Sequence, residues 1–361
     1  MSKLRVDVIG IVGLPASYGG FETLVENLVI NKSKNVKYKV YCSSKSYQVH
    51  QCFYKGASLE YLNVNPNGAS SIFYDIFSLM KSIKSKPNVV LILGVSGCLF
   101  LPIFRTLSKS KIVINIDGLE WKRDKWGFFA KKFLKLSEYV AIKFSDSIIT
   151  DNQAITEYVK QVYNIDSHTI AYGGDNALCV SDYKIRDEVD ISSLTPYFLG
   201  LCRIEPENNV EMILKAFDGI DKKLVFIGNW NASLYGKSLK EKYGALKNII
   251  LKDPIYDIDT LYQYRKNCIA YIHGHSAGGT NPTLVEIMHF EKHVLAFDCV
   301  FNRFTTDNCC DYFINTEDII KIVSKDPVYF KESIQAKKLK SIADKLYTWK
   351  YISELYENLY K

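Results

Sequence analysis

No stretch of this sequence is apolar for long enough to cross a membrane as a helix. The most apolar uncharged segment, residues 89–104, is sixteen residues long and contains two glycines, a serine and a proline, whereas a bilayer requires about 20 apolar residues. We interpret this segment as a buried strand followed by a buried helix. The first residues also lack the apolar run and the cleavage site of a secretory signal.

Paired cysteines are missing as well. The nine cysteines include no Cys-x-x-Cys motif, and their number is odd, which argues against a disulfide framework and against zinc-site spacing. Together with the missing signal, this pattern predicts reduced thiols and a cytoplasmic location. We expect the adjacent Cys309 and Cys310 to pack in the interior rather than to bind a metal.

The charge of the chain is unevenly distributed. The 361 residues carry a formal net charge of +7, with 22 Lys and Arg against 13 Asp and Glu in residues 1–170, and 24 against 26 in residues 171–361. A basic first half indicates an anionic partner, and nucleic acid and anionic lipid headgroups are both candidates. The length favours two domains.

Short apolar segments alternate with amphipathic ones, which predicts parallel sheets covered by helices on both faces. We expect strands at 4–12, 38–42, 89–93, 112–115, 147–150, 197–200, 224–227, 249–251, 268–272 and 294–297. Helices are expected at 21–29, 72–84, 128–144, 153–161, 210–217, 234–243, 261–266, 282–290 and 332–361.

The alternation breaks near the glycines and polar residues of 172–196. The sequence therefore predicts an α/β protein with two Rossmann-like, doubly wound domains. The first spans 1–171 and the second 197–345, residues 172–196 link them, and a C-terminal helix at 346–361 crosses back to the first domain. We expect ligands to bind beyond the carboxyl ends of the strands, in a central cleft that the two domains face.

The loop after the first strand carries Gly19 and Gly20 immediately before a helix, with Glu22 in its first turn. Two glycines at such a position let backbone N–H groups approach an anion, and the helix dipole adds partial positive charge. The alternative is a plain strand-to-helix turn. The loop does not match Gly-x-Gly-x-x-Gly, so a dinucleotide cofactor is disfavoured.

A second glycine-bearing loop precedes a helix that begins near residue 282. Asn281 is predicted to cap this helix and Pro282 to be its first residue. Residues 278–280 would then present main-chain amides to an anion. Glu286, one turn into the helix, could accept hydrogen bonds from the paired hydroxyls of a ribose; the alternative is a solvated helix carboxylate.

Arg203 follows the first strand of the second domain, where its planar fork of donors could neutralise a diphosphate. The alternative is a solvated surface arginine. The Asp-x-Asp at 257–259 could hold a divalent ion, but N-capping of the next helix is the favoured interpretation. The histidine pairs 273/275 and 289/293 show no third ligand, so we expect satisfied or exposed histidines and no metal site.

These loops carry a resemblance to a known family. The chain resembles retaining glycosyltransferases of the GT-B fold (family 4-like), and residues 13–23 look most like the signature of the bacterial rhamnosyltransferase branch. Segments 117–123 and 203–209 also look like that branch. Two positions depart from the wider family, which usually has a lysine where this chain has Asn208 and a glutamate where it has Gly278; the branch shares both changes.

The resemblance implies a role for each matching residue. Donor-binding residues would be Gly19, Gly20, Arg203, Gly228, Ile255, Gly278, Gly279, Thr280, Asn281 and Glu286. Acceptor-binding residues would be Tyr18, Glu22 and Glu120. Arg203 would stabilise the departing diphosphate, and Asp117 would act as a base or orient the acceptor. For Asp117 the alternative is a turn-forming aspartate before Gly118.

Residues 121–143 interleave seven Lys and Arg with aromatic and aliphatic side chains. This composition suits an interfacial helix on an anionic membrane, and the alternative is a core helix with a solvated lysine face. No nucleic-acid-binding module is recognisable, so we expect no nucleic-acid partner. The first domain would instead meet the cytosolic membrane surface, which makes the protein peripheral on the inner face of the cell membrane.

The resemblance implies transfer of a deoxyhexose, L-rhamnose from dTDP-L-rhamnose, with retention onto a lipid-linked saccharide during synthesis of a surface polysaccharide such as O-antigen or capsule. The nucleotide sugar would be a substrate, and no cofactor would be required. Two alternatives stay open. One is another nucleotide-sugar donor, or a sugar-nucleotide epimerase, on the same fold. The other is a non-catalytic, glycosyltransferase-like scaffold.

Overall fold

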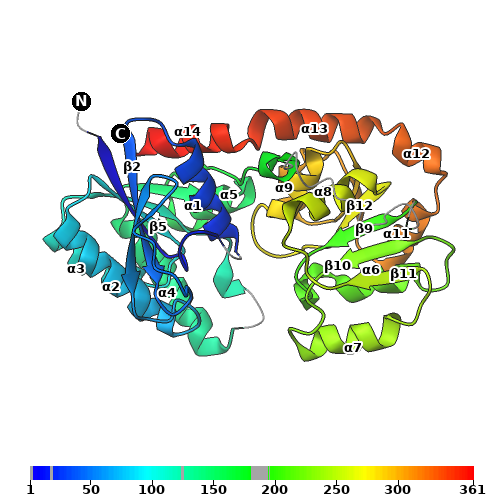
Figure 1. The fold of residues 1–361 in the computed structure, drawn as a ribbon, viewed down its shortest axis with the longest axis horizontal. Helices are drawn as coiled ribbons and strands as arrows, with labels where there is room; N and C mark the ends of the chain where they lie inside the picture. Colours follow the sequence, from blue (N-terminus) through cyan, green and yellow to red (C-terminus); the bar gives the residue numbers. More distant parts are fainter. Residues whose placement is uncertain (1–2, 17–18, 123–125, 180–193, 195) are drawn as a thin grey trace. The chain divides into compact units, whose positions relative to one another are not determined.

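The computed structural model describes residues 3–16, 19–122, 126–179, 194 and 196–361. The chain divides into two compact units, each built around one sheet (Figure 1). The N-terminal unit comprises Met1–Ala171 together with Trp349–Lys361, and the C-terminal unit comprises Tyr172–Thr348. The α/β class with two Rossmann-like, parallel-sheet domains is confirmed.

The sheet of the N-terminal unit has the strand order β3-β4-β2-β1-β5-β6-β7-β8, and all neighbouring strands are parallel except the β3–β4 pair. Its strands are β1 (Leu4–Ile9), β2 (Val36–Ser43), β3 (Phe53–Tyr54), β4 (Ala57–Leu62), β5 (Val89–Leu93), β6 (Lys111–Asn115), β7 (Ser147–Thr150) and β8 (His168–Thr169). All five residues of β5 are buried, as expected for a central strand covered on both faces. Strand order reverses between β1 and β5.

The described part of this unit contains the α-helices α1 (Gly20–Asn31), α2 (Ser70–Ser85), α3 (Leu101–Leu107), α4 (Phe128–Phe144), α5 (Gln153–Tyr163) and α14 (Trp349–Leu359). The last helix packs against α1. Its Tyr356 hydroxyl accepts a hydrogen bond from the Asn115 amide at 2.8 Å, and the hydroxyls of Tyr360 and Tyr38 lie 3.2 Å apart. The C-terminal residues thus form part of the core around the first sheet.

The sheet of the C-terminal unit is fully parallel, with the order β11-β10-β9-β12-β13-β14. Its strands are β9 (Phe198–Leu201), β10 (Leu224–Ile227), β11 (Ile249–Lys252), β12 (Ala270–His273), β13 (His293–Phe297) and β14 (Asp311–Phe313). Strand order reverses between β9 and β12. In open α/β sheets, ligands bind at such reversal points, beyond the carboxyl ends of the strands.

Helices cover this second sheet on both faces: α6 (Val210–Phe217), α7 (Leu234–Tyr243), α8 (Ile258–Asn267), α9 (Pro282–Met288), α10 (Val300–Thr305), α11 (Thr316–Val323), α12 (Pro327–Lys331) and α13 (Ile334–Leu346). Large aromatic side chains, including Phe198, Phe217, Phe226 and Trp230, fill the core on one side. Each of them removes a large apolar surface from water, which is the main driving force for this packing.

The predicted elements agree with the structure in most cases, and the bounds predicted for α4, α6 and β10 are those observed. Strands β3, β4, β8 and β14 and helices α10 to α12 were not predicted. The predicted tail helix 332–361 is two helices, α13 and α14, separated at residues 347–348. Residues 172–179, which the sequence assigned to a linker, lie in the C-terminal unit; residues 180–193 and 195 of that segment lie outside the described residues.

Candidate functional site

Two loops meet at the strand reversal of the C-terminal unit, one after β9 (202–209) and one after β12 (274–281). Main-chain and side-chain hydrogen bonds join them. The amide and the hydroxyl of Ser276 both donate to the Glu207 carbonyl oxygen, at 3.0 and 2.8 Å. The side-chain amide of Asn209 donates to the Gly274 carbonyl oxygen at 2.8 Å. The two loops therefore form one connected surface at the carboxyl edge of the sheet.

Asn208 is the central connector between these loops. Its side chain is 3% exposed, and its amide donates to the Arg203 carbonyl oxygen at 2.7 Å. Its Oδ1 lies 2.8 Å from Nδ1 of His275, which donates because Oδ1 can only accept. Where the resembled family has a lysine, this chain therefore has a buried amide that fixes the backbone of the residue expected to meet the diphosphate.

The guanidinium of Arg203 is about half exposed at the start of the first loop. Its Nη1 lies 3.5 Å from Oε1 of Glu205, an exposed pair that contributes little to stability. Gly228, which follows the neighbouring strand β10, packs against this loop: a Cβ there would lie 2.4 Å from the Ile204 side chain. Ile255 follows β11 on the same edge. These sequence-predicted donor residues thus follow adjacent strands.

The predicted cap of α9 is confirmed. The Asn281 side chain accepts a hydrogen bond from the Thr283 amide at 3.0 Å, and Pro282 is the first helical residue. Thr280 is buried just before the cap, and Gly278 adopts a φ of +113°, which favours glycine. Gly278, Gly279, Thr280 and Asn281 therefore lie together in the loop after β12.

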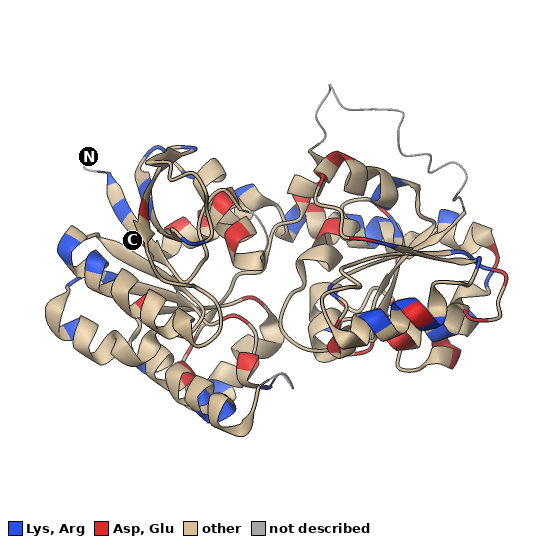
Figure 2. Ribbon diagram, turned by 60° about the horizontal axis from the view of Figure 1, so that its bottom comes forward, with Lys and Arg blue, Asp and Glu red and all other residues tan. Residues whose placement is uncertain are grey.

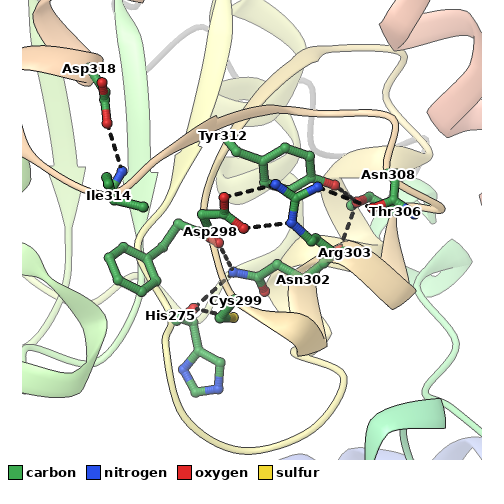
Figure 3. A network of polar contacts seen from close by, with 11 residues as sticks. His275, Asp298, Cys299, Asn302, Arg303, Thr306, Asn308, Tyr312, Ile314 and Asp318 are labelled. Carbon is green, nitrogen blue, oxygen red and sulfur yellow. Dashed lines mark hydrogen bonds and ion pairs between the residues drawn. The ribbon is translucent and has the colours of Figure 1, made fainter.

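A polar network contacts the second loop at the main chain of His275 (Figure 3). The His275 carbonyl oxygen accepts a hydrogen bond from the side-chain amide of Asn302 at 2.8 Å. Next to it, the Arg303 guanidinium donates to both carboxylate oxygens of Asp298, at 2.6 and 2.8 Å, and lies 4.3 Å from the ring centroid of Tyr312. The Asn302 bond fixes the main chain of the second loop at His275, and the charged Arg303–Asp298 pair holds α10 to the residue that follows β13.

The alternative interpretation of Glu286 as a solvated helix carboxylate is wrong. Its carboxylate forms an ion pair with Arg265, a residue of α8 that is 4% exposed. The sequence analysis did not identify Arg265, because a basic residue in the last turn of a helix is usually solvated and favoured by the dipole. The pair fixes the orientation of the Glu286 side chain at the base of the second loop.

His273 ends β12 at the same edge and differs from expectation. It is buried, and its Nε2 has no hydrogen-bond partner among the residues that the structure describes. Burial holds the pKa of this imidazole well below its usual value, so it is neutral at physiological pH. His289 and His293, in contrast, are satisfied as predicted, by Asp344 and Tyr347 and by Ser333 and Asp311 respectively.

In the N-terminal unit, the Glu22 side chain joins helix α1 to the loop after β1. Its Oε1 accepts a hydrogen bond from the Val12 amide at 2.9 Å, and burial raises the pKa of the carboxyl. Gly19 has a φ of +140°, and a Cβ at this position would lie 1.9 Å from Oε2 of Glu22. Gly20 begins α1. A glycine at 19 is therefore required by both the backbone and the carboxylate.

A pocket of about 130 Å³ opens at the strand reversal of this unit. It is lined by Gly10, Ile11, Val12, Glu22, Pro66, Asn67, Ser71, Tyr74, Asp75, Leu93 and Ser96. These residues come from the loops after β1, β4 and β5 and from α1 and α2. Of the two predicted acceptor residues that the structure describes, Glu22 lines it and Glu120 does not. Asp75 was not identified from the sequence.

Asp117 and Glu120 follow β6, the neighbour of β5. Asp117 has a φ of +62°, and its amide donates to Oδ1 of Asn115 at 2.9 Å. This left-handed conformation, which aspartate tolerates better than most residues, fits the turn-forming alternative. Glu120 accepts a hydrogen bond from the Trp126 indole at 3.0 Å. Tyr18, the remaining predicted acceptor residue, lies outside the described residues.

The structure favours helix capping over metal binding for the Asp-x-Asp at 257–259. Asp257 caps α8, as predicted, by accepting hydrogen bonds from the Thr260 amide at 2.9 Å and the Thr260 hydroxyl at 2.7 Å. Among the described residues, no three His, Cys, Asp or Glu side chains are grouped so that they could hold a metal ion.

Comparisons with known proteins agree with this architecture. Residues 182–323 match the family of glycosyl transferases group 1, and residues 3–175 match a domain of unknown function (DUF1972). A search of the curated proteins gave no match. Among solved structures, sucrose-phosphate synthase from Thermosynechococcus elongatus superposes with a TM-score of 0.82 at 13% identity, over 99% of this chain and 98% of that one.

Two further structures share the fold. Anabaena HepE (Alr3699) in complex with UDP-glucose has a TM-score of 0.72 at 12% identity, with 98% of each chain covered. The catalytic domain of starch synthase IV from Arabidopsis thaliana, bound to ADP and acarbose, has a TM-score of 0.70 at 12% identity, covering 100% of this chain and 99% of that one. These structures share the fold of the whole chain, and residues 182–323 match the glycosyl transferases group 1 model.

Proposed function

We propose that this GT-B glycosyltransferase moves a deoxyhexose, L-rhamnose from dTDP-L-rhamnose, with retention onto a lipid-linked saccharide in the synthesis of a surface polysaccharide such as O-antigen or capsule. The nucleotide sugar is a substrate, and the reaction needs no further cofactor. The observation that carries the nucleotide-sugar part is the pair of hydrogen-bonded loops at the β9–β12 reversal, with Arg203 on one and Gly278–Thr280 on the other. The choice of rhamnose rests on the resemblance of residues 13–23, 117–123 and 203–209.

The chemistry of glycosyl transfer accounts for these residue types. Cleavage of a glycosyl–phosphate bond places negative charge on the departing diphosphate and positive charge on the sugar. Preorganised N–H groups and a guanidinium stabilise the first of these charges without reorganisation during the reaction. In this chain, the buried Asn208 holds the Arg203 backbone at the position where the resembled family usually has a lysine. HepE in complex with UDP-glucose supports a nucleotide-sugar donor.

A ligand panel tests the donor assignment. Of dTDP, UDP, GDP and ADP, dTDP should raise the melting temperature most, because a ligand that binds only the folded state stabilises it by mass action. Labelled dTDP-L-rhamnose incubated with undecaprenyl-diphosphate saccharides should then give a labelled lipid product. If none of the nucleotides shifts the melting temperature and no nucleotide sugar serves as donor, the proposed function is wrong. Turnover of the nucleotide sugar without an acceptor would favour the epimerase alternative.

We place the lipid-linked acceptor at an anionic membrane surface that contacts helices α2, α3 and α4. These helices are consecutive neighbours in the N-terminal unit, and Figure 2 shows Lys and Arg on the helices of this unit. Large apolar side chains are exposed on all three: Phe73, Phe77, Met80, Ile103, Leu107, Phe128, Phe129, Leu136 and Tyr139. Lys84, Lys132 and Lys143 are exposed among them. No described helix is both long and apolar enough to span a bilayer.

The exposure of Phe128 and Phe129, at 65% and 86%, supports membrane contact over a plain core helix. A core helix with a solvated lysine face would have no reason to hold two adjacent aromatic rings in water, whereas an interfacial helix buries such rings among the headgroups. The basic side chains nearby attract anionic lipid, by about 1 kcal/mol for each residue close to the surface.

A double substitution of Phe128 and Phe129 by serine should lower binding to phosphatidylglycerol-containing vesicles by about tenfold or more, because two buried rings are lost. Cosedimentation at constant salt measures this. The matched control is Phe53→Ser, which removes an equally exposed aromatic ring from β3, outside α2, α3 and α4. Equal binding by the double variant and the native protein, or equal loss in the control, would contradict the assigned surface.

A further inference from the structure

The pocket at the strand reversal of the N-terminal unit is lined by two buried carboxyl groups. Asp75, in the second turn of α2, is 5% exposed, and Glu22 is almost as buried. Among the residues that the structure describes, the lining includes no lysine, arginine or histidine. A water molecule occupies about 30 Å³ of the liquid, so about 130 Å³ of free volume accommodates several waters or the edge of one sugar ring. The pocket is therefore polar, small and without positive charge.

Asp75 lines this pocket and packs closely against the loop after β5. The loop after β5 passes so near α2 that a Cβ on Gly97 would lie 2.4 Å from the Cβ of Asp75. The Gly97 amide hydrogen-bonds the Asp75 carboxyl, but burial outweighs this and raises the pKa of Asp75 to about 8. At neutral pH the group is thus mostly protonated, and it offers one O–H donor as well as acceptor capacity.

Two hydroxyls of the pocket already donate to main-chain oxygens. The Tyr74 hydroxyl donates to the Tyr41 carbonyl oxygen at 2.9 Å, and that of Ser71 to the Gly68 carbonyl oxygen at 2.7 Å. Their side chains therefore act as walls of the pocket. The carboxyls of Asp75 and Glu22 can serve as donor and acceptor to neighbouring hydroxyls, and the Ser96 hydroxyl and the Asn67 amide line the same pocket.

We propose that this pocket binds one neutral, hydroxyl-bearing sugar ring of the acceptor, with Asp75 donating and Glu22 accepting hydrogen bonds, and that it excludes uronic acids and other anionic sugars. The proposal rests on the proposed function, because it makes the pocket an acceptor subsite. Exclusion follows from the lining: an anionic sugar would place its carboxylate beside Asp75 and Glu22, with no cation in the pocket to compensate for its lost hydration.

Binding of methyl glycosides to the full-length protein tests this proposal. Saturation-transfer NMR with neutral methyl hexopyranosides and with methyl glucuronide should show binding of at least one neutral glycoside and at least fivefold weaker binding of the glucuronide. Asp75→Leu, which keeps the size but removes the polar group, should weaken neutral-glycoside binding at least fivefold. Asp7→Asn is the matched control, since Asp7 is a buried carboxyl of the same unit that bonds Tyr41 and Ser85 away from the pocket.

The pH profile separates binding from a structural role. Native binding should weaken as the pH rises from 6.5 to 9, because Asp75 loses its proton in this range. Asp75→Asn keeps a donor that does not titrate, so its binding should be independent of pH. Burial raises the pKa of the Cys98 thiol and of the Tyr74 hydroxyl well above their usual values, so neither loses its proton in this range. Burial also raises the pKa of Glu22, which both proteins retain, so the difference between their pH profiles reports Asp75.

Several results would overturn the pocket assignment. These are binding of no neutral glycoside, equal binding of the glucuronide, native affinity in Asp75→Leu, or the same pH profile in the native protein and Asp75→Asn. The melting-temperature shift with nucleotide diphosphates is measured on every variant, which confirms folding. Nucleotide binding without glycoside binding removes the pocket assignment and leaves the proposed function standing, whereas glycoside binding without any nucleotide binding removes the proposed function.

Discussion

Arg203→Ala should transfer sugar about 100- to 1000-fold more slowly than the native protein, which is the cost of removing one preorganised donor to a developing oxyanion. The guanidinium is exposed at the carboxyl edge of β9, and the chain has Asn208 where the resembled family has a second cation. No other basic side chain is therefore expected to replace it. Initial rates with a saturating nucleotide-sugar donor measure the loss, and the loss should appear in kcat.

Glu205→Gln is the control for this experiment. Glu205 is the carboxylate nearest to Arg203, and an exposed ion pair of this kind contributes at most about 1 kcal/mol. The rate of this variant should stay within a few-fold of the native rate. A native rate in Arg203→Ala would exclude the guanidinium from catalysis, and absence of turnover in the native protein together with nucleotide binding would favour the scaffold alternative.

Arg265→Met should lower the free energy of unfolding of the C-terminal unit by about 3–5 kcal/mol, because it leaves the Glu286 carboxylate buried without its partner. Both side chains of the pair are largely excluded from water. Urea unfolding followed by tryptophan fluorescence measures the change, since the buried Trp230 belongs to the core of this unit. Lys242→Met is the control: its ion pair with Glu211 is exposed on both sides, so the midpoint should not move.

A double variant distinguishes charge burial from packing. Arg265→Met combined with Glu286→Leu removes both charges and should recover part of the lost stability, because replacing a whole buried pair by apolar side chains is often neutral. Nucleotide binding should not recover, since Glu286 is expected to meet the ribose. An unchanged midpoint in Arg265→Met would show that the pair is solvated in solution.

Local sequence signals were sufficient to predict the frame of the molecule. Buried strands such as β5 consist of consecutive apolar residues, and the α9 start has a capping Asn281 followed by Pro282. Both signals are contained within a few residues, and neither depends on distant contacts. The loops with Arg203 and Gly278 could be located for the same reason, since they directly follow predicted strands.

The residues that the sequence did not reveal depend on contacts between distant segments. Asp75 occupies an amphipathic helix where an acidic residue usually faces water, and its burial depends on Gly97, 22 positions further along the chain. Arg265 similarly looks like a solvated basic residue until Glu286 of the next helix is placed beside it. In the sequence, Asn208 was noted only as the position where the resembled family usually has a lysine. Its role as a connector between the two loops depends on its hydrogen bond with His275. His273 was expected to be satisfied or exposed and is neither.

The position of α14 has a consequence for the order in which the protein matures. Residues 349–361 complete the core of the N-terminal unit, where Tyr356 and Tyr360 meet Asn115 and Tyr38. A ribosome releases this helix only after it has made all of the C-terminal unit. During translation, the first sheet therefore keeps an uncovered apolar surface beside α1 until this helix is made. A chain that stalls before residue 349 would be a substrate for chaperones and proteases.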